Sequence, residues 1–287
     1  MVSEREGENR FNYNPKGLKM TIDYFSDLHI DFYAKFNTQK INALADRLLN
    51  TKTDKNFDVL VIAGDIGHYN EDNIYFLSLL AKHYKKVFVT WGNHDLYLLP
   101  SNREKYNYNS FNRLKELKEK LKKIPNLTFL DGEKVEYNGI TFWGSGLWYD
   151  VASLSHWADY MNDAKYIYDT KKPYKIVMPY DWYPTKFNFN TNRLYKKELE
   201  KIEKLDRADV IISHIPPINF GVSKDMGDNY YFVPYGEKII EKIKPKIWIF
   251  GHTHIKRDLK FGKTRLICNP LGYPDENREF KIESVEV

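Results

Sequence analysis

Five short polar clusters follow apolar, strand-like runs along the chain, and their residue types are those that bind metal ions. They supply carboxylates, one amide and five of the chain's eight histidines. The clusters are Asp27-Leu28-His29, Gly64-Asp65, Gly92-Asn93-His94-Asp95, Ser213-His214 and Gly251-His252-Thr253-His254. Because carboxylates and neutral imidazoles are ligands for ions such as Zn, Mn and Fe, this residue set could hold two metal ions beside a phosphate ester.

The spacing within two clusters indicates paired ligands. Asp27 and His29 lie two positions apart, and so do His252 and His254. In an extended segment successive side chains alternate, so we expect each pair to point to one side. A carboxylate between two such pairs can bridge two ions, and ions roughly 3.5–4 Å apart can generate a hydroxide and hold a phosphoryl group for in-line displacement.

Each fragment taken alone also has a purely structural explanation. Gly-Asp is common in turns, and Asp-x-His can be a capping pair at the edge of a core. Gly-His-Thr-His at the end of an apolar strand is more specific, and the ordered set of five clusters is more specific still.

The elements that must position these clusters alternate in type. Strands are expected at residues 20–25, 59–63 and 86–91, and helices at 42–49, 73–83 and 111–123. The continuous apolar run at 59–63 is typical of a strand buried on both faces. This order predicts an α/β layered domain with parallel pairing at its centre. Ligand sites in such folds gather outside the carboxyl ends of the strands, so one fold could bring all five clusters to a common edge.

The second half of the chain continues the pattern with shorter elements. A charged helix is expected at 191–204, and the Asn138-Gly139 dipeptide predicts a hairpin turn. Further strands are expected at 127–130, 134–137, 140–143, 209–212, 246–250, 257–261, 264–268 and 280–285. We find no repeat and no linker, which predicts a single domain over 20–287 after a loose polar leader at 1–19.

The composition of the chain gives weaker indications of its partners and location. Lys and Arg outnumber Asp and Glu by 44 to 39, a net charge of +5 that is too small to indicate a nucleic-acid partner by itself. The single cysteine, Cys268, excludes an intrachain disulfide and fits a reducing cytoplasm, which is the expected location. The N-terminal residues lack the apolar core of a signal peptide, and the apolar runs are too short to cross a bilayer, so no membrane partner is expected.

The ordered set of clusters resembles the motifs of the calcineurin-like metallophosphoesterase superfamily, with every element intact from Met20 onward. The resemblance implies a four-layer α/β/β/α sandwich, in which two mixed β-sheets lie face to face with helices outside. It also implies a metal-dependent hydrolase of phosphate esters.

The resemblance further implies roles for individual residues. Asp27, His29 and His254 would hold one metal ion, Asn93, His214 and His252 would hold the other, and Asp65 would bridge them. His94 would protonate the leaving oxygen or stabilise charge on the transferred phosphoryl group, and Asp95 would orient His94. The mixed nitrogen and oxygen ligands suit Mn, Fe, Zn or Ni, with Mn favoured.

Other segments indicate which branch of the superfamily the chain resembles. The phosphoprotein-phosphatase branch carries Asp-Arg-Gly soon after its Gly-Asp, and this chain does not. Residues 143–148, 161–163 and 268–273, with Glu276-Asn277, look like a group of stand-alone bacterial and phage-type metallophosphoesterases. That group commonly has Arg where this chain has Leu271, so any contact made by that Arg would be absent here.

The expected function is therefore a phosphodiesterase or phosphatase acting on small or nucleotide-like phosphate esters. A metal-bridging hydroxide would attack phosphorus while His94 assists the leaving group. A metal-dependent nuclease is one alternative, because the surface is mildly basic. The other is a non-catalytic metal-binding or scaffold protein that retains the fold, although such proteins usually lose ligands and none is missing here.

Several features outside the five clusters have two interpretations. The aromatic-rich segment at about 150–190 is either a lid that stacks on a nucleobase or a satellite core under a long loop. His68 is either a surface loop residue or one that faces the substrate, and His156 is either a packing residue beside Trp157 or one that lines the pocket. His83 is interpreted as a complement to a helix dipole. Gly144-Ser145-Gly146 lacks the third glycine of a dinucleotide-binding loop and is set aside.

Overall fold

The structure is a computed structural model that describes residues 19–54, 56–151, 154–176, 185–220 and 231–287. The polar leader expected at 1–19 lies outside the described residues except for Lys19. Among the described helices, none is both long enough and apolar enough to cross a membrane.

The first sheet has five strands in the order β13-β1-β2-β3-β4. Its parallel strands are β1 (Thr21–Phe25), β2 (Val59–Ala63), β3 (Lys86–Thr90) and β4 (Leu127–Phe129). The last strand of the chain, β13 (Glu283–Glu286), closes the edge antiparallel to β1. All five residues of β2 are buried, as its continuous apolar sequence predicts.

The second sheet has six strands in the order β11-β12-β10-β9-β6-β5. The central strands β12, β10, β9 and β6 are parallel, and β11 and β5 are antiparallel edges. Their bounds are β5 (Lys134–Tyr137), β6 (Ile140–Gly144), β9 (Val210–Ile212), β10 (Ile247–Phe250), β11 (Arg257–Phe261) and β12 (Thr264–Cys268).

The two sheets pack face to face through an apolar layer. Alternate residues of β2 serve the two sides of the first sheet, since Val59 and Val61 pack in the cluster between the sheets while Leu60 and Ile62 pack in the larger cluster that includes the helices. Phe88 of β3 stacks on Phe142 of β6 with ring centroids 4.3 Å apart.

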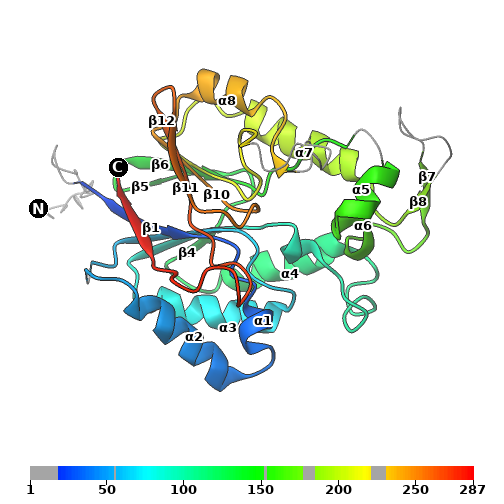
Figure 1. Cartoon of the computed structure of the whole chain (residues 1–287), viewed down its shortest axis with the longest axis horizontal. Coiled ribbons are helices and arrows are strands. Elements are labelled where there is room, and N and C mark those ends of the chain that lie inside the picture. The colour runs from blue at the N-terminus through cyan, green and yellow to red at the C-terminus, as the bar shows by residue number, and fades with distance from the viewer. Residues whose placement is uncertain (1–18, 55, 152–153, 177–184, 221–230) are drawn as a thin grey trace, which may run out of the picture.

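Helices cover the outer faces of both sheets, with α1 to α4 on the side of the first sheet and α7 and α8 on the side of the second (Figure 1). The first set is α1 (Ile30–Ala34), α2 (Thr38–Asn50), α3 (Asn70–Ala81) and α4 (Ser110–Leu121). The second set is α7 (Thr191–Glu203) and α8 (Gly236–Ile243). The expected sandwich of two mixed sheets flanked by helices is thus confirmed.

The aromatic-rich segment projects at one end of the molecule (Figure 1). It contains α5 (Leu154–Tyr160), α6 (Asp163–Tyr166) and a separate hairpin of β7 (Tyr174–Ile176) and β8 (Thr185–Phe187). Trp157, Phe187 and Phe189 are buried against one another and belong to the larger apolar cluster that includes the helices, so they pack in the main core and not in a separate satellite core. Tyr180, Trp182 and Tyr183 lie outside the described residues.

Candidate metal centre

All five polar clusters lie just beyond the carboxyl ends of strands, where the two sheets meet. Asp27, Asp65 and Asn93 follow β1, β2 and β3 of the first sheet, while the histidine clusters follow β9 and β10 of the second. Backbone hydrogen bonds join the sheets here, because Ser26 donates to Asn269 at 3.1 Å and accepts from Leu271 at 2.9 Å. The structure therefore brings the clusters to one edge of the sandwich.

The backbone turns sharply at the ligand positions. Five of them have left-handed φ values, a conformation that costs free energy for any residue other than glycine. They are Asp27 (53°), His29 (42°), Asp65 (54°), His252 (74°) and His254 (53°). The expectation that each pair lies on an extended segment is therefore wrong, since the strand before Asp27 ends at Phe25. The side chains converge because the chain turns at each of them.

One group of side chains comprises Asp27, His29, Asp65 and His254. Each offers a ligand atom, and these atoms all lie within 4.8 Å of one another. Nε2 of His29 lies 3.0 Å from Nε2 of His254, which is itself 3.4 Å from Oδ1 of Asp27. Two imidazole nitrogens this close are stable only when a proton or a cation lies between them, so this group fits a metal ion.

A second group adjoins the first at Asp65. Oδ1 of Asn93 lies 3.0 Å from Nε2 of His214 and 3.2 Å from Nδ1 of His252. Oδ2 of Asp65 lies 3.3 Å from Nε2 of His214 and 3.7 Å from Nε2 of His29. The Asp65 carboxylate therefore lies between the two groups, where it could contact ions in both.

Neighbouring acceptors fix which atoms of these side chains face the centre. Nδ1 of His214 donates to the Ala63 carbonyl at 2.9 Å, and Nδ1 of His254 lies 2.6 Å from Oε2 of Glu276. Both contacts leave Nε2 as an unprotonated ligand atom in the neutral ring. Such outer partners are typical of metal-binding histidines.

Asn93 is oriented in the same way by a carboxylate that the five clusters do not include. Its Nδ2 donates to Oδ1 of Asp163 at 2.8 Å, so its Oδ1 is directed to the histidines. Asp163 is fully buried and also accepts hydrogen bonds from the hydroxyls of Tyr97 and Tyr149. The sequence signal for Asp163 was its place in the 161–163 segment of the resemblance.

The electrostatics of the centre favour bound cations. Burial by itself would raise the pKa of Asp65, but His214, His94 and His29 hold that pKa well below its usual value. Burial likewise opposes a charge on His214, yet Asp65 raises the pKa of His214 to about 9. A centre that draws a proton onto a buried imidazole attracts a divalent cation for the same reason. Its carboxylate, amide and imidazole donors suit Mn, Fe, Zn or Ni.

His94 lies beside the ligand groups, but its imidazole has a different partner from the one expected. Its backbone amide donates to Oδ1 of Asp65 at 2.8 Å, and its Nδ1 lies 2.9 Å from Nε2 of His68. Nδ1 of His68 lies in turn 2.7 Å from Oδ2 of Asp31. The interpretation of His68 as a surface loop residue is therefore wrong, since its side chain is buried against His94.

Asp95 supports the backbone of the site and not the His94 ring. Its carboxylate accepts hydrogen bonds from the amides of Gly92 at 2.8 Å and Ile66 at 3.2 Å, which ties together the loops after β3 and β2. Burial, with the nearby Asp65 carboxylate, raises the pKa of Asp95 to about 6. The contact with His94 that the expected orienting role requires is thus replaced by the contact between His94 and His68.

Arg113 is a site-supporting residue that the sequence reasoning missed. Its fully buried guanidinium donates to the carbonyls of His94 at 2.9 Å and of Gly67, which holds the two loops that carry His94 and His68. The available signal was a charged residue on the apolar face of α4, next to Leu114 and in line with Leu117.

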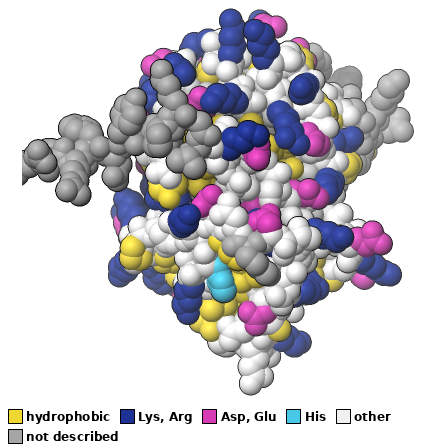
Figure 2. All heavy atoms as spheres, turned by 90° about the vertical axis from the view of Figure 1, so that its left-hand side faces the viewer, with side chains coloured by type: hydrophobic (Ala, Val, Ile, Leu, Met, Phe, Trp, Pro, Cys, Tyr) yellow, Lys and Arg dark blue, Asp and Glu magenta, His cyan; other side chains and the backbone are white. Residues whose placement is uncertain are grey.

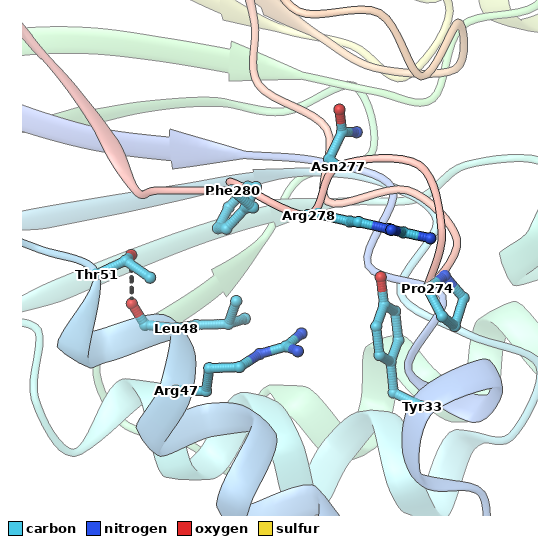
Figure 3. A pocket seen from close by; sticks show the side chains of 8 residues that line it. All are labelled: Tyr33, Arg47, Leu48, Thr51, Pro274, Asn277, Arg278 and Phe280. Atoms are coloured by element: carbon cyan, nitrogen blue, oxygen red, sulfur yellow. Dashed lines mark hydrogen bonds between the residues drawn. The ribbon is translucent and has the colours of Figure 1, made fainter.

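The segment after β12 forms one wall of the centre. The ring of Tyr273 stacks on that of His29 with centroids 4.6 Å apart, and Glu276 contacts His254. Its other side lines a pocket of about 180 Å³ with Tyr33, Arg47 and Phe280 (Figure 3), where the Tyr33 hydroxyl donates to the Gly272 carbonyl at 2.9 Å. Leu271 is buried in the core, so the position that carries Arg in the related group is apolar here.

The remaining histidines lie apart from the ligand groups. His83 is exposed just beyond α3, with its ring 5.9 Å from that of Phe57. His156 packs within α5, with its ring 4.5 Å from that of Tyr160.

Comparisons with known proteins identify the family and the fold. A sequence profile of the calcineurin-like phosphoesterase family matches residues 20–256. A protein from Acanthamoeba polyphaga mimivirus, described as uncharacterized protein L509, is 26% identical over 281 residues, covering 90% of this chain and 93% of that one. The crystal structure of a phosphopantetheinyl hydrolase from Mycobacterium tuberculosis is similar with a TM-score of 0.66 and 18% identity, covering 92% of this chain and 95% of that one. The chain belongs to the calcineurin-like phosphoesterase family, whose members hydrolyse phosphate esters.

Proposed function

We propose that the protein is a dinuclear-metal phosphodiesterase or phosphatase acting on small or nucleotide-like phosphate esters. The observation that carries this proposal is the position of Asp65 between two groups of ligand atoms, 3.7 Å from His29 and 3.3 Å from His214. We further propose that it acts as one domain over residues 20–287 and in the cytoplasm, to which its single, buried Cys268 is suited.

Each side chain has a task in this proposal. Asp27, His29 and His254 hold one ion, Asn93, His214 and His252 hold the other, and Asp65 contacts both. When bound, two such ions polarise the phosphoryl oxygens and lower the pKa of water enough for attack on phosphorus. His94 is only partly buried, and in this proposal it donates a proton to the leaving oxygen.

The first experiment measures metal content and activity together. The purified protein is analysed for Mn, Fe, Zn and Ni, and then assayed with added Mn on a chromogenic phosphomonoester, a phosphodiester, cyclic nucleotides and single-stranded DNA. We expect close to two ions per chain and hydrolysis of the small esters. A protein that binds none of these metals would be a scaffold, and both enzyme proposals would fail.

The same panel tests the nuclease alternative. On the face shown in Figure 2, from which β1 runs inward, Lys and Arg side chains are interspersed with Asp and Glu over the described surface. A nuclease would show preferential cleavage of single-stranded DNA and a steep dependence of binding on salt. We expect neither.

Two substitutions separate metal binding from proton donation. Asp65→Ala is expected to lose bound metal and all hydrolysis. His94→Ala is expected to keep its metal and lose roughly 10²–10⁴-fold in kcat. His83→Ala, which changes an exposed histidine far from the ligands, serves as the control. Substantial activity in either site variant would refute the assigned roles.

A further inference from the structure

Three side chains from different elements form a continuous row behind the candidate metal centre. Asp31 lies in the first turn of α1, His68 follows β2, and His94 follows β3. Oδ2 of Asp31 is 2.7 Å from Nδ1 of His68, and Nε2 of His68 is 2.9 Å from Nδ1 of His94. The side chains of Asp31 and His68 are each only 7% exposed, so these contacts are shielded from water.

Hydrogen-bond chemistry fixes the protons in this row. An ionised carboxylate only accepts, so Nδ1 of His68 carries a hydrogen and donates it to Asp31. In the neutral ring Nε2 of His68 is then an acceptor, and it takes the hydrogen of Nδ1 of His94. His94 is left with Nε2 as the ring nitrogen available to a substrate.

A second contact makes the arrangement rigid. The backbone amide of His68 donates to Oδ1 of Asp31 at 3.1 Å, so each carboxylate oxygen of Asp31 has its own donor on the same residue. Helix α1 and the loop after β2 approach each other closely here, since a Cβ at Gly67 would lie 2.9 Å from Oδ1 of Asp31. Asp31 therefore fixes both the place and the tautomer of the His68 ring.

We propose that Asp31 and His68 are positioning residues that keep an acceptor on Nδ1 of His94, so that His94 delivers a proton from Nε2 to the leaving oxygen. The inference rests on the proposed function. As hydroxide attacks phosphorus, the bond between phosphorus and the leaving oxygen breaks. The electron pair of that bond takes the Nε2 proton of His94, which leaves a neutral His94 ring still hydrogen-bonded to His68. An acceptor at Nδ1 holds the His94 ring in one orientation, with Nε2 as the nitrogen that faces the leaving oxygen.

The first test is spectroscopic and needs no activity. Nitrogen-15 histidine NMR of the full chain without metal is expected to show His68 protonated at Nδ1, with the signal assigned from its loss in His68→Gln. In Asp31→Asn the amide oxygen stays with the backbone donor, so the NH2 group faces Nδ1 of His68 and reverses the tautomer. A wild-type His68 protonated only at Nε2 would overturn the proposal.

The second test compares substrates whose leaving groups differ in acidity. A merely structural defect would lower activity on all of them equally. Asp31→Asn is expected to lower kcat roughly 10–100-fold on phosphodiesters with poor alkyl leaving groups, with little change on nitrophenyl diesters or in KM. His68→Gln keeps an acceptor oxygen for His94 and should retain more activity on the poor substrate than His68→Leu. Equal losses on both substrates would contradict the proposal.

Asp72→Asn is the matched control. Asp72 is another buried aspartate that accepts from a backbone amide, that of Phe36 at 2.9 Å, and its variant should match the wild type on every substrate. If the metal-loaded wild type hydrolyses no ester, the proposed function fails, and the NMR tautomer alone decides whether Asp31 and His68 position the His94 ring.

Discussion

At the scale of single residues, the orientation of the Asn93 amide depends on Asp163. A carboxylate only accepts hydrogen bonds, so Asn93 must turn its NH2 group to Asp163 and its oxygen to His214 and His252. Without that carboxylate the amide is free to flip, and a flipped amide would present N–H donors where a cation should bind. Asp163 thus controls the chemistry of the second ligand group through the Asn93 amide.

Asp163→Asn is therefore expected to weaken the second metal site by roughly 10–100-fold and to leave the first nearly unchanged. Calorimetric titration of the metal-free protein with Mn should show two sites of similar affinity in the wild type and one strong and one weak site in the variant. Asp159→Asn, on the exposed side of α5, is the control. Equal weakening of both sites would show that the substitution acts on the whole centre.

At the scale of elements, the loop after β6 passes so close to Trp91 that only glycine fits at position 146. A Cβ there would lie 2.6 Å from three atoms of the buried Trp91 ring. The carbonyl of the same glycine accepts hydrogen bonds from the amides of His214 and Ile215, each at 3.1 Å. The Gly144-Ser145-Gly146 segment therefore serves close packing, and it also places a candidate ligand.

Gly146→Ala is expected to lower the free energy of unfolding by about 1–3 kcal/mol through overpacking and to weaken metal binding as His214 shifts. Urea denaturation and Mn titration measure the two effects. Gly262→Ala, in the turn between β11 and β12, is the control because it has a left-handed φ of 59° but no atom near its Cβ. It should lose stability and keep its metal affinity. The proposed link between packing and the site fails if Gly146→Ala binds Mn normally.

Elements with strong hydrophobic patterns could be predicted from the sequence, and the contacts between them could not. The continuous apolar run of β2 was predicted with its observed bounds, Val59–Ala63, because burial on both faces leaves that signature. The helix α1 has five residues, too few to show a period, and was missed. It carries Asp31 to His68, a contact across 37 positions, and without it His68 looks like a surface residue.

The backbone conformation of the ligand residues could not be predicted from the sequence for a different reason. Spacing of two suggested extended pairs, but Asp27 and His29 both adopt left-handed φ values. Such strain persists only when surrounding contacts enforce it. Here the amides of Asp27 and His29 donate to the carbonyls of Gly64 and Asp65, each at 3.1 Å, so the constraint comes from the neighbouring loop after β2.

At the scale of the whole molecule, the candidate metal centre joins the two sheets. The first sheet supplies four of the proposed ligands, and the second supplies the other three, after β9 and β10. Those from the first sheet are Asp27, His29, Asp65 and Asn93, and those from the second are His214, His252 and His254. Direct hydrogen bonds also cross this edge, such as that from the His252 amide to Oδ1 of Asp27 at 2.9 Å. Bound cations would therefore hold together parts of the fold that separate on unfolding.

Metal removal should consequently lower the thermal stability of the whole chain. A ligand that binds only the folded state stabilises it by about 2.7 kcal/mol at 100 times its Kd. Because each kcal/mol corresponds to roughly 2–4 °C in domains of nearly this size, Mn added to chelator-treated protein should raise Tm by roughly 5–10 °C. In Asp65→Asn, which lacks the shared negative charge between the groups, most of that increase should disappear, whereas His83→Ala should keep it. A wild-type Tm that does not respond to Mn, Fe, Zn or Ni would mean that these side chains converge without binding an ion.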